Sequence, residues 1–151
     1  MTKRNWVLIS FAVVLAGVYV FSFTDWFKTK TIHITHTSRL IRGAVRAGPR
    51  NNSAAMPIIF TFERAYEFKE VKVVALNAFQ SNKLAEPVWH LVSDSGSDDV
   101  DHFFYGGNID GMDPAVEGSQ PEPLQPGVTY RLFVTAGKIK GWHDFQAKSA
   151  N

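Results

Sequence analysis

The sequence contains no cysteine, which excludes a disulfide scaffold, a thiolate zinc site, an iron–sulfur cluster and a cysteine nucleophile. It also lacks a large excess of either charge. The formal net charge is +2, whereas a dedicated nucleic-acid-binding protein is usually far more basic, so no nucleic-acid partner is expected. Hydrophobic residues make up 45% of the 151 residues and aromatic residues 13%, which favours one ordinary domain with a real core over a disordered chain.

Familiar catalytic motifs are absent as well. The chain has no Gly-x-Ser-x-Gly elbow, no His-Glu-x-x-His motif and no phosphate- or dinucleotide-binding glycine pattern. Ser93, Ser95 and Ser97 lie near His90 in the sequence, but polar turns commonly have this composition. We therefore predict a protein that is not an enzyme, with no catalytic residues, no cofactor and no identifiable small-molecule substrate.

A long apolar run lies near the N-terminus. Residues 6–23 (WVLISFAVVLAGVYVFSF) carry no charge, and about 20 such residues in a helix span the ~30 Å hydrocarbon core of a bilayer. The run is longer than the apolar region of a typical signal peptide, and no Ala-x-Ala cleavage site follows it. The sequence therefore predicts an uncleaved transmembrane anchor, with a cleaved signal peptide as the alternative.

Residues at the ends of this run suit such an anchor. Trp6, Tyr19 and Trp26 would lie at the membrane interfaces, and Gly17 is a small residue suited to contact with a neighbouring helix. A short basic N-terminal tail usually stays in the cytoplasm, although a count of basic residues slightly favours the opposite orientation. The expected location is the bacterial inner membrane, single-pass, with the C-terminal domain in the periplasm.

The rest of the chain reads as short strands separated by turns. Alternating or β-branched segments predict seven strands, at 30–35, 57–62, 71–76, 88–92, 101–105, 128–136 and 142–147. This spacing indicates an all-β sandwich, with no helix expected outside the anchor. The predicted organisation is a tail and anchor at 1–27, a basic juxtamembrane strand and loop at 28–55, the rest of the sandwich at 56–147, and a tail at 148–151.

The segment 124–134 (LQPGVTYRLFV) resembles the L-x-P-G-x-x-Y-x-x-x-V stretch of fibronectin type III and related immunoglobulin-like domains. This resemblance implies an immunoglobulin-like sandwich in which Tyr130 forms the tyrosine corner and Trp89 is the core tryptophan. The wider pattern, P-x-W, then Y-G, then P-G-x-x-Y, is similar to that of uncharacterised single-domain bacterial envelope proteins. The chain departs from that group because it has no lipobox cysteine. Such folds host many functions, so the resemblance implies little about activity.

Histidines and acidic turns are the candidate metal ligands. His33 and His36 are three residues apart, and on a strand they would face opposite sides of the sheet. The acidic turns at 94–101 and 107–113 lack the EF-hand order of ligands. We expect no metal site, although a copper or zinc site built from two or three histidines, or a weak calcium site, stays open as an alternative.

Basic residues without acidic neighbours precede the strands of the main domain. They offer a docking strip for anionic lipid head groups or for an acidic partner. The residues of this strip are Lys28, Lys30, Arg39, Arg42, Arg46 and Arg50.

Taken together, these features favour a structural or accessory subunit of a larger integral membrane protein complex. Photosynthetic and respiratory electron-transport assemblies contain single-span subunits of this kind, which is an analogy only. An extracytoplasmic ligand-binding or adhesion module is the first alternative, and it should carry an aromatic patch around Trp142, Phe103, Phe104 and Tyr105. A histidine-based metal-handling periplasmic protein is the second.

Overall fold

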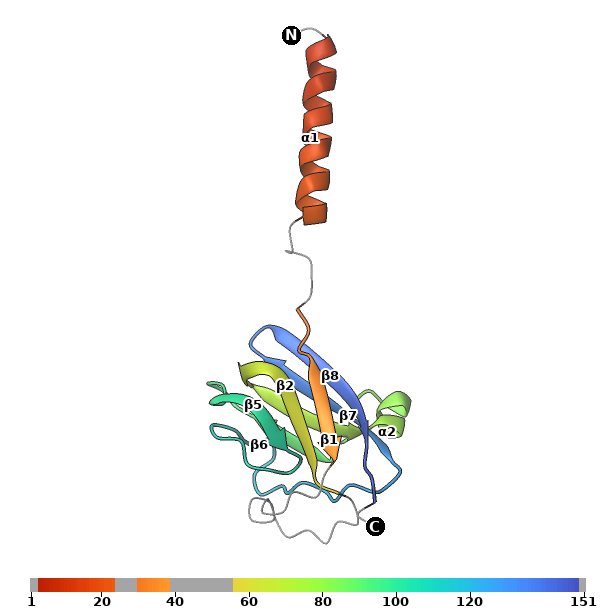
Figure 1. Ribbon diagram of the computed structural model, residues 1–151, viewed down its shortest axis with the longest axis vertical. Helices are drawn as coiled ribbons and strands as arrows, with labels where there is room; N and C mark the ends of the chain where they lie inside the picture. The colour runs from red at the N-terminus through yellow and green to blue at the C-terminus, as the bar shows by residue number, and fades with distance from the viewer. Residues whose placement is uncertain (1–2, 24–29, 39–55, 150–151) are drawn as a thin grey trace. The chain divides into compact units, whose positions relative to one another are not determined.

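The computed structural model describes residues 3–23, 30–38 and 56–149 (Figure 1). The chain divides into two compact units, Met1–Lys30 and Thr31–Asn151. The first unit contains helix α1 (Lys3–Phe23), on which Trp6 is 68% exposed and Tyr19 is 64% exposed. Apart from the backbone of the helix itself, no described atom lies within 4 Å of a Cβ built on Gly17. Trp26 lies outside the described residues.

The prediction of a transmembrane anchor is wrong. In the part of the chain that the structure describes, no helix is both long and apolar enough to cross a membrane. This finding also contradicts the transmembrane part of the predicted fold class and the single-pass inner-membrane location.

The second unit is built from two antiparallel sheets, as Figure 1 shows. The smaller sheet has the order β1-β2-β5, with bounds β1 (Ile34–Ser38), β2 (Ile58–Glu67) and β5 (Asp99–Phe104). The larger sheet has the order β6-β4-β3-β7-β8, with bounds β3 (Glu70–Ala75), β4 (Trp89–Val92), β6 (Asp113–Pro114), β7 (Thr129–Ala136) and β8 (Ile139–Gln146). The expectation of a mostly β domain therefore agrees with this arrangement.

Alternating burial explains why these segments form strands. Every second residue of β7 is buried, so the strand presents one apolar side to the core and a mixed side outward. The aromatic rings of Phe60, Phe62, Phe68 and Phe103 meet between the sheets, and Phe60 and Phe68 are completely buried. Large aromatic side chains supply much of the buried area that stabilises a domain of this size.

Several elements differ from the sequence-based expectation: β1 is Ile34–Ser38 where 30–35 was predicted, β8 begins at residue 139 and not at 142, and the short strand β6 was not expected. Strand β2 continues to Glu67, whereas the prediction ended it at residue 62. A short helix, α2 (Leu76–Ser81), follows β3 where no helix was expected. Six residues are too few to show helical periodicity or to form a stable isolated helix, so its stability must come from packing, in which Phe79 contacts Phe133 with ring centroids 5.2 Å apart.

The residues that carry the immunoglobulin-like resemblance lie in the core. Tyr130 is 4% exposed near the start of β7, and its hydroxyl accepts a hydrogen bond of 3.0 Å from the backbone N–H of Gln125. Trp89 is also 4% exposed. It lies on β4, whereas the core tryptophan of immunoglobulin-like domains lies on strand C, which corresponds to the neighbouring strand β3. The order β4-β3-β7-β8 is compatible with the C′-C-F-G order of such domains. Membership of that family stays a prediction.

Candidate functional site

The outward side of the five-stranded sheet carries a row of large side chains from four strands. Strand register places His90 opposite Lys72, Lys72 opposite Phe133 and Phe133 opposite Trp142. Arg131 lies two residues before Phe133 on the same side of β7. We call the side of the sheet that bears these five residues the outer face.

Trp142 and Arg131 form the centre of the outer face. The indole of Trp142 is 55% exposed, although the residue lies in the middle of β8, and the guanidinium carbon of Arg131 lies 4.3 Å from the centroid of its ring. Arg131 also donates two hydrogen bonds to Asp144, from Nε at 2.5 Å and from Nη2 at 2.7 Å. The hydrogen bonds from Arg131 keep the pKa of Asp144 below its usual value. Arg131 is therefore held in one position against the ring.

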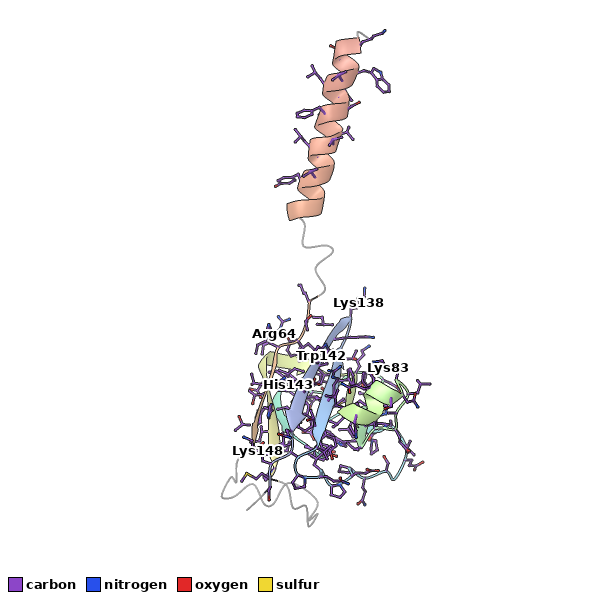
Figure 2. The ribbon with its side chains drawn as sticks, turned by 90° about the vertical axis from the view of Figure 1, so that its right-hand side faces the viewer. Arg64, Lys83, Lys138, Trp142, His143 and Lys148 are labelled. Atoms are coloured by element: carbon purple, nitrogen blue, oxygen red, sulfur yellow. The ribbon has the colours of Figure 1, made fainter. Side chains whose placement is uncertain are left out.

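Two further aromatic rings extend the outer face toward α2. The Arg131 guanidinium lies 5.8 Å from the Phe79 ring centroid, and the Lys83 ammonium lies 4.3 Å from the same centroid. Lys72 approaches the Phe133 ring at 5.7 Å. Cations alternate with rings, an arrangement that cation–π attraction stabilises. Trp142 and Lys83 can be located in Figure 2.

The outer face carries more positive than negative charge. One carboxylate oxygen of Glu70, Oε1, lies 3.7 Å from Nζ of Lys72 and 3.0 Å from Nε2 of His90. Asp144 pairs with Arg131. Among the described residues, no acidic side chain forms an ion pair with Lys83 or with Lys140, which is exposed two residues before Trp142 on the same side of β8. Two cations without an acidic partner in the described part of the chain therefore flank the aromatic centre.

A second feature is a pair of histidines between β1 of the smaller sheet and β8 of the larger sheet. His36 Nδ1 and His143 Nε2 are 2.7 Å apart, so one imidazole donates a hydrogen bond to the other. Burial is the main cause that lowers the pKa of both rings. The charge of nearby Lys148 lowers the pKa of His36 further. The pKa of His143 is also lowered by His36, and Asp144 partly opposes this shift. The pair is thus a link between the two sheets that requires at least one neutral ring.

Acidification is expected to destabilise the domain through this histidine pair. Because burial lowers both pKa values below the ordinary value of about 6.5, the unfolded chain binds more protons than the folded chain as the pH falls through 6.5. The contribution of the pair to the free energy of unfolding should be constant above about pH 7 and should fall below it. Urea unfolding of the wild type and of the H36Q/H143Q variant across this range measures the effect.

The double variant should show a weaker dependence on pH than the wild type. H102Q is the matched control, because the His102 side chain is 60% exposed on β5 and pairs with Asp101. It should keep the full dependence. Identical pH profiles for the wild type and the double variant would contradict the role of the pair.

The structure assembles few of the sites expected from the sequence. Of the predicted docking strip, Lys30 is exposed, whereas Lys28, Arg39, Arg42, Arg46 and Arg50 lie outside the described residues. The aromatic patch expected around Trp142 is not formed from the expected partners, because Phe103 is 4% exposed within the core. Among residues 3–23, 30–38 and 56–149, no group of three or more histidine or acidic side chains is placed to hold a metal ion.

Sequence reasoning missed the outer face, although part of the signal was present. Alternation along the strands predicted at 128–136 and 142–147 places Arg131, Phe133 and Trp142 on the side opposite the core. The contribution of Phe79 had no such signal, since α2 was not expected. Comparisons with known proteins add no assignment: a scan against protein-family models gave no match, and searches of curated proteins and of solved structures also gave none.

Proposed function

We propose that the protein is a non-enzymatic accessory subunit, which binds an acidic surface of a partner protein through the outer face. The observation that carries this proposal is the exposed Trp142 ring, held against the Arg131 guanidinium at 4.3 Å on an otherwise regular sheet. Tryptophan and arginine are the residue types that most often dominate the binding energy of protein interfaces.

The fixed position of these side chains favours binding. Immobilising a long side chain on association costs about 0.5–1.5 kcal/mol. Arg131 is already held by two hydrogen bonds to Asp144, so this cost is reduced before the partner arrives. The outer face therefore has the character of a preorganised contact centre.

The charge of the outer face indicates the kind of partner. Lys83 and Lys140 flank the aromatic centre without acidic partners among the described residues. Complementary charges accelerate association and discriminate against partners of the wrong sign. An acidic surface with an apolar centre fits the outer face best.

Replacing Trp142 by alanine is expected to remove the protein from its complex. The wild-type chain, tagged and expressed in its native cells, should elute by size exclusion in a complex larger than its own 16.9 kDa. The W142A variant should bind its partner at least about 30-fold more weakly, since a central tryptophan contributes about 2 kcal/mol or more. K83E and K140E should weaken binding by a smaller factor that decreases as the salt concentration rises.

V116A is the matched control for this experiment. Val116 is 69% exposed on the loop between β6 and β7, so its truncation also removes an exposed apolar side chain. The control should stay in the complex, and both variants should keep the wild-type melting temperature. A W142A variant that elutes with the complex as fully as V116A does would contradict the proposal.

A further inference from the structure

A cleft of about 450 Å³ lies between β4 and the long connection from β5 to β7, here called the loop, which contains the short strand β6. Its volume falls within the range of about 300–1,000 Å³ that is typical of ligand-binding clefts. The cleft shares His90 on β4 with the outer face, but none of the other four residues that define that face lines it. Its use therefore does not depend on the function proposed above.

The loop is attached to the edge of β4 at both ends of the cleft. The backbone N–H of Ala115 donates to the carbonyl of His90 at 3.1 Å, and that of Glu122 donates to the carbonyl of Val88 at 2.8 Å. The hydroxyl of Tyr105 donates to the carbonyl of Glu122 at 2.7 Å. These hydrogen bonds hold the cleft open without a ligand.

A glycine and a buried tryptophan complete the cleft wall. A Cβ on Gly106 would lie 3.0 Å from Cγ of Pro121, which is a tight contact, and the left-handed φ of +70° at this position favours glycine. Trp89, which is 4% exposed, packs against Tyr105 with ring centroids 5.3 Å apart. The cleft is thus preformed and partly apolar.

The ionisable side chains that line the cleft are two carboxylates and the imidazole of His90. Glu86 and Glu122 contribute exposed carboxylates, and no lysine or arginine is among the described residues that line the cleft. Proline side chains and Val116 supply apolar surface beside these carboxylates. An occupant should therefore carry a positive charge and a short apolar stem.

We infer that this cleft binds an organic cation, an ammonium or guanidinium group on an aliphatic stem. The group has two sources, a free alkylamine and a lysine or arginine side chain of a peptide. In either case the cation would lie at Glu86 and Glu122, and the stem would lie against the apolar wall between β4 and the loop.

The test uses the full-length, ¹⁵N-labelled chain and two-dimensional amide spectra. The free-amine arm uses n-butylammonium and n-butylguanidinium, with neutral n-butanol for comparison. The peptide arm uses acetyl-Gly-Lys-Gly-amide and its glutamine counterpart. The cationic compounds should shift the amide signals of residues 86–91 and 106–122 saturably, and the neutral compounds should not.

Charge-neutralising variants locate the binding site. The E86Q/E122Q variant should raise the dissociation constant at least about tenfold, because it removes both carboxylates that line the cleft. The D94N/E117Q variant also removes two negative charges, but from exposed residues that do not line the cleft. It should bind the cationic compounds as tightly as the wild type does. Its binding therefore separates the cleft from a general attraction to an acidic surface.

The outcomes of these experiments distinguish the two sources of the cation, and some of them would overturn the inference. Binding of the lysine peptide without the free amines identifies a basic peptide as the ligand, and the reverse identifies a free amine. The inference is overturned if no cationic compound gives saturable shifts, if butanol binds as tightly as butylammonium, or if both double variants lose binding equally. Loss of the partner complex in W142A, with amine binding retained, would separate the outer face from the cleft.

Discussion

Replacing Phe145 by alanine is expected to destabilise the domain by about 3–5 kcal/mol, the usual cost of removing a buried phenyl ring. Phe145 is 2% exposed on β8, and its ring meets Phe60 at 4.9 Å, Tyr130 at 5.8 Å and His36 at 6.1 Å between centroids. It therefore contacts both sheets. Because small domains are stable by about 5–15 kcal/mol, this loss is a large share of the total.

The matched comparison for F145A is F79A. Both variants remove one phenyl ring, but Phe79 lies on the short helix α2 and is only partly buried against the outer face. F79A should cost roughly 1 kcal/mol, in proportion to the smaller apolar area that it buries. Urea unfolding of both variants at neutral pH gives the two free energies. Equal losses would show that Phe145 does not join the sheets.

Replacing Gly141 by alanine is expected to destabilise the domain by about 1–3 kcal/mol, through overpacking and not through a cavity. A Cβ at this position of β8 would lie 2.8 Å from Cβ of Ile32, 3.0 Å from the carbonyl oxygen of Ile32 and 3.3 Å from Cγ2 of Val134. Ile32 is 2% exposed, and the nearest atoms are not the end of a flexible side chain. Residue 32 must therefore move away from β8.

Unfolding free energies and amide spectra measure this effect. The G141A spectrum should change most around residues 31–36, because the segment before β1 approaches β8 there, with the N–H of Ile32 3.4 Å from the carbonyl of Lys140. K140A, a change at the exposed neighbour, should stay within about 0.5 kcal/mol of the wild type. A G141A variant as stable as K140A would contradict the close approach of Ile32.

Local sequence patterns predicted much of the sandwich, because successive side chains of a strand point to opposite faces and this alternation can be read from a short stretch of sequence. Alternation in the segment 128–136 predicted a strand there, and in the structure Leu132 and Val134 are buried on one side of β7. A helix also forms over the apolar run near the N-terminus. Its predicted role as a membrane span is contradicted, so an uncharged run was sufficient to predict helix but not to predict that role.

The candidate sites depended on contacts between distant parts of the chain. His36 and His143 are 107 residues apart in sequence, and the pairing of Arg131 with Asp144 depends on the register of β7 against β8. The position of Phe79 depends on a helix that packing alone stabilises. The sequence by itself determined where most of the strands form and, where apolar and polar residues alternate as in 128–136, which residues face inward. Only the tertiary structure decided which outward and edge residues meet, because register and sheet packing bring them together.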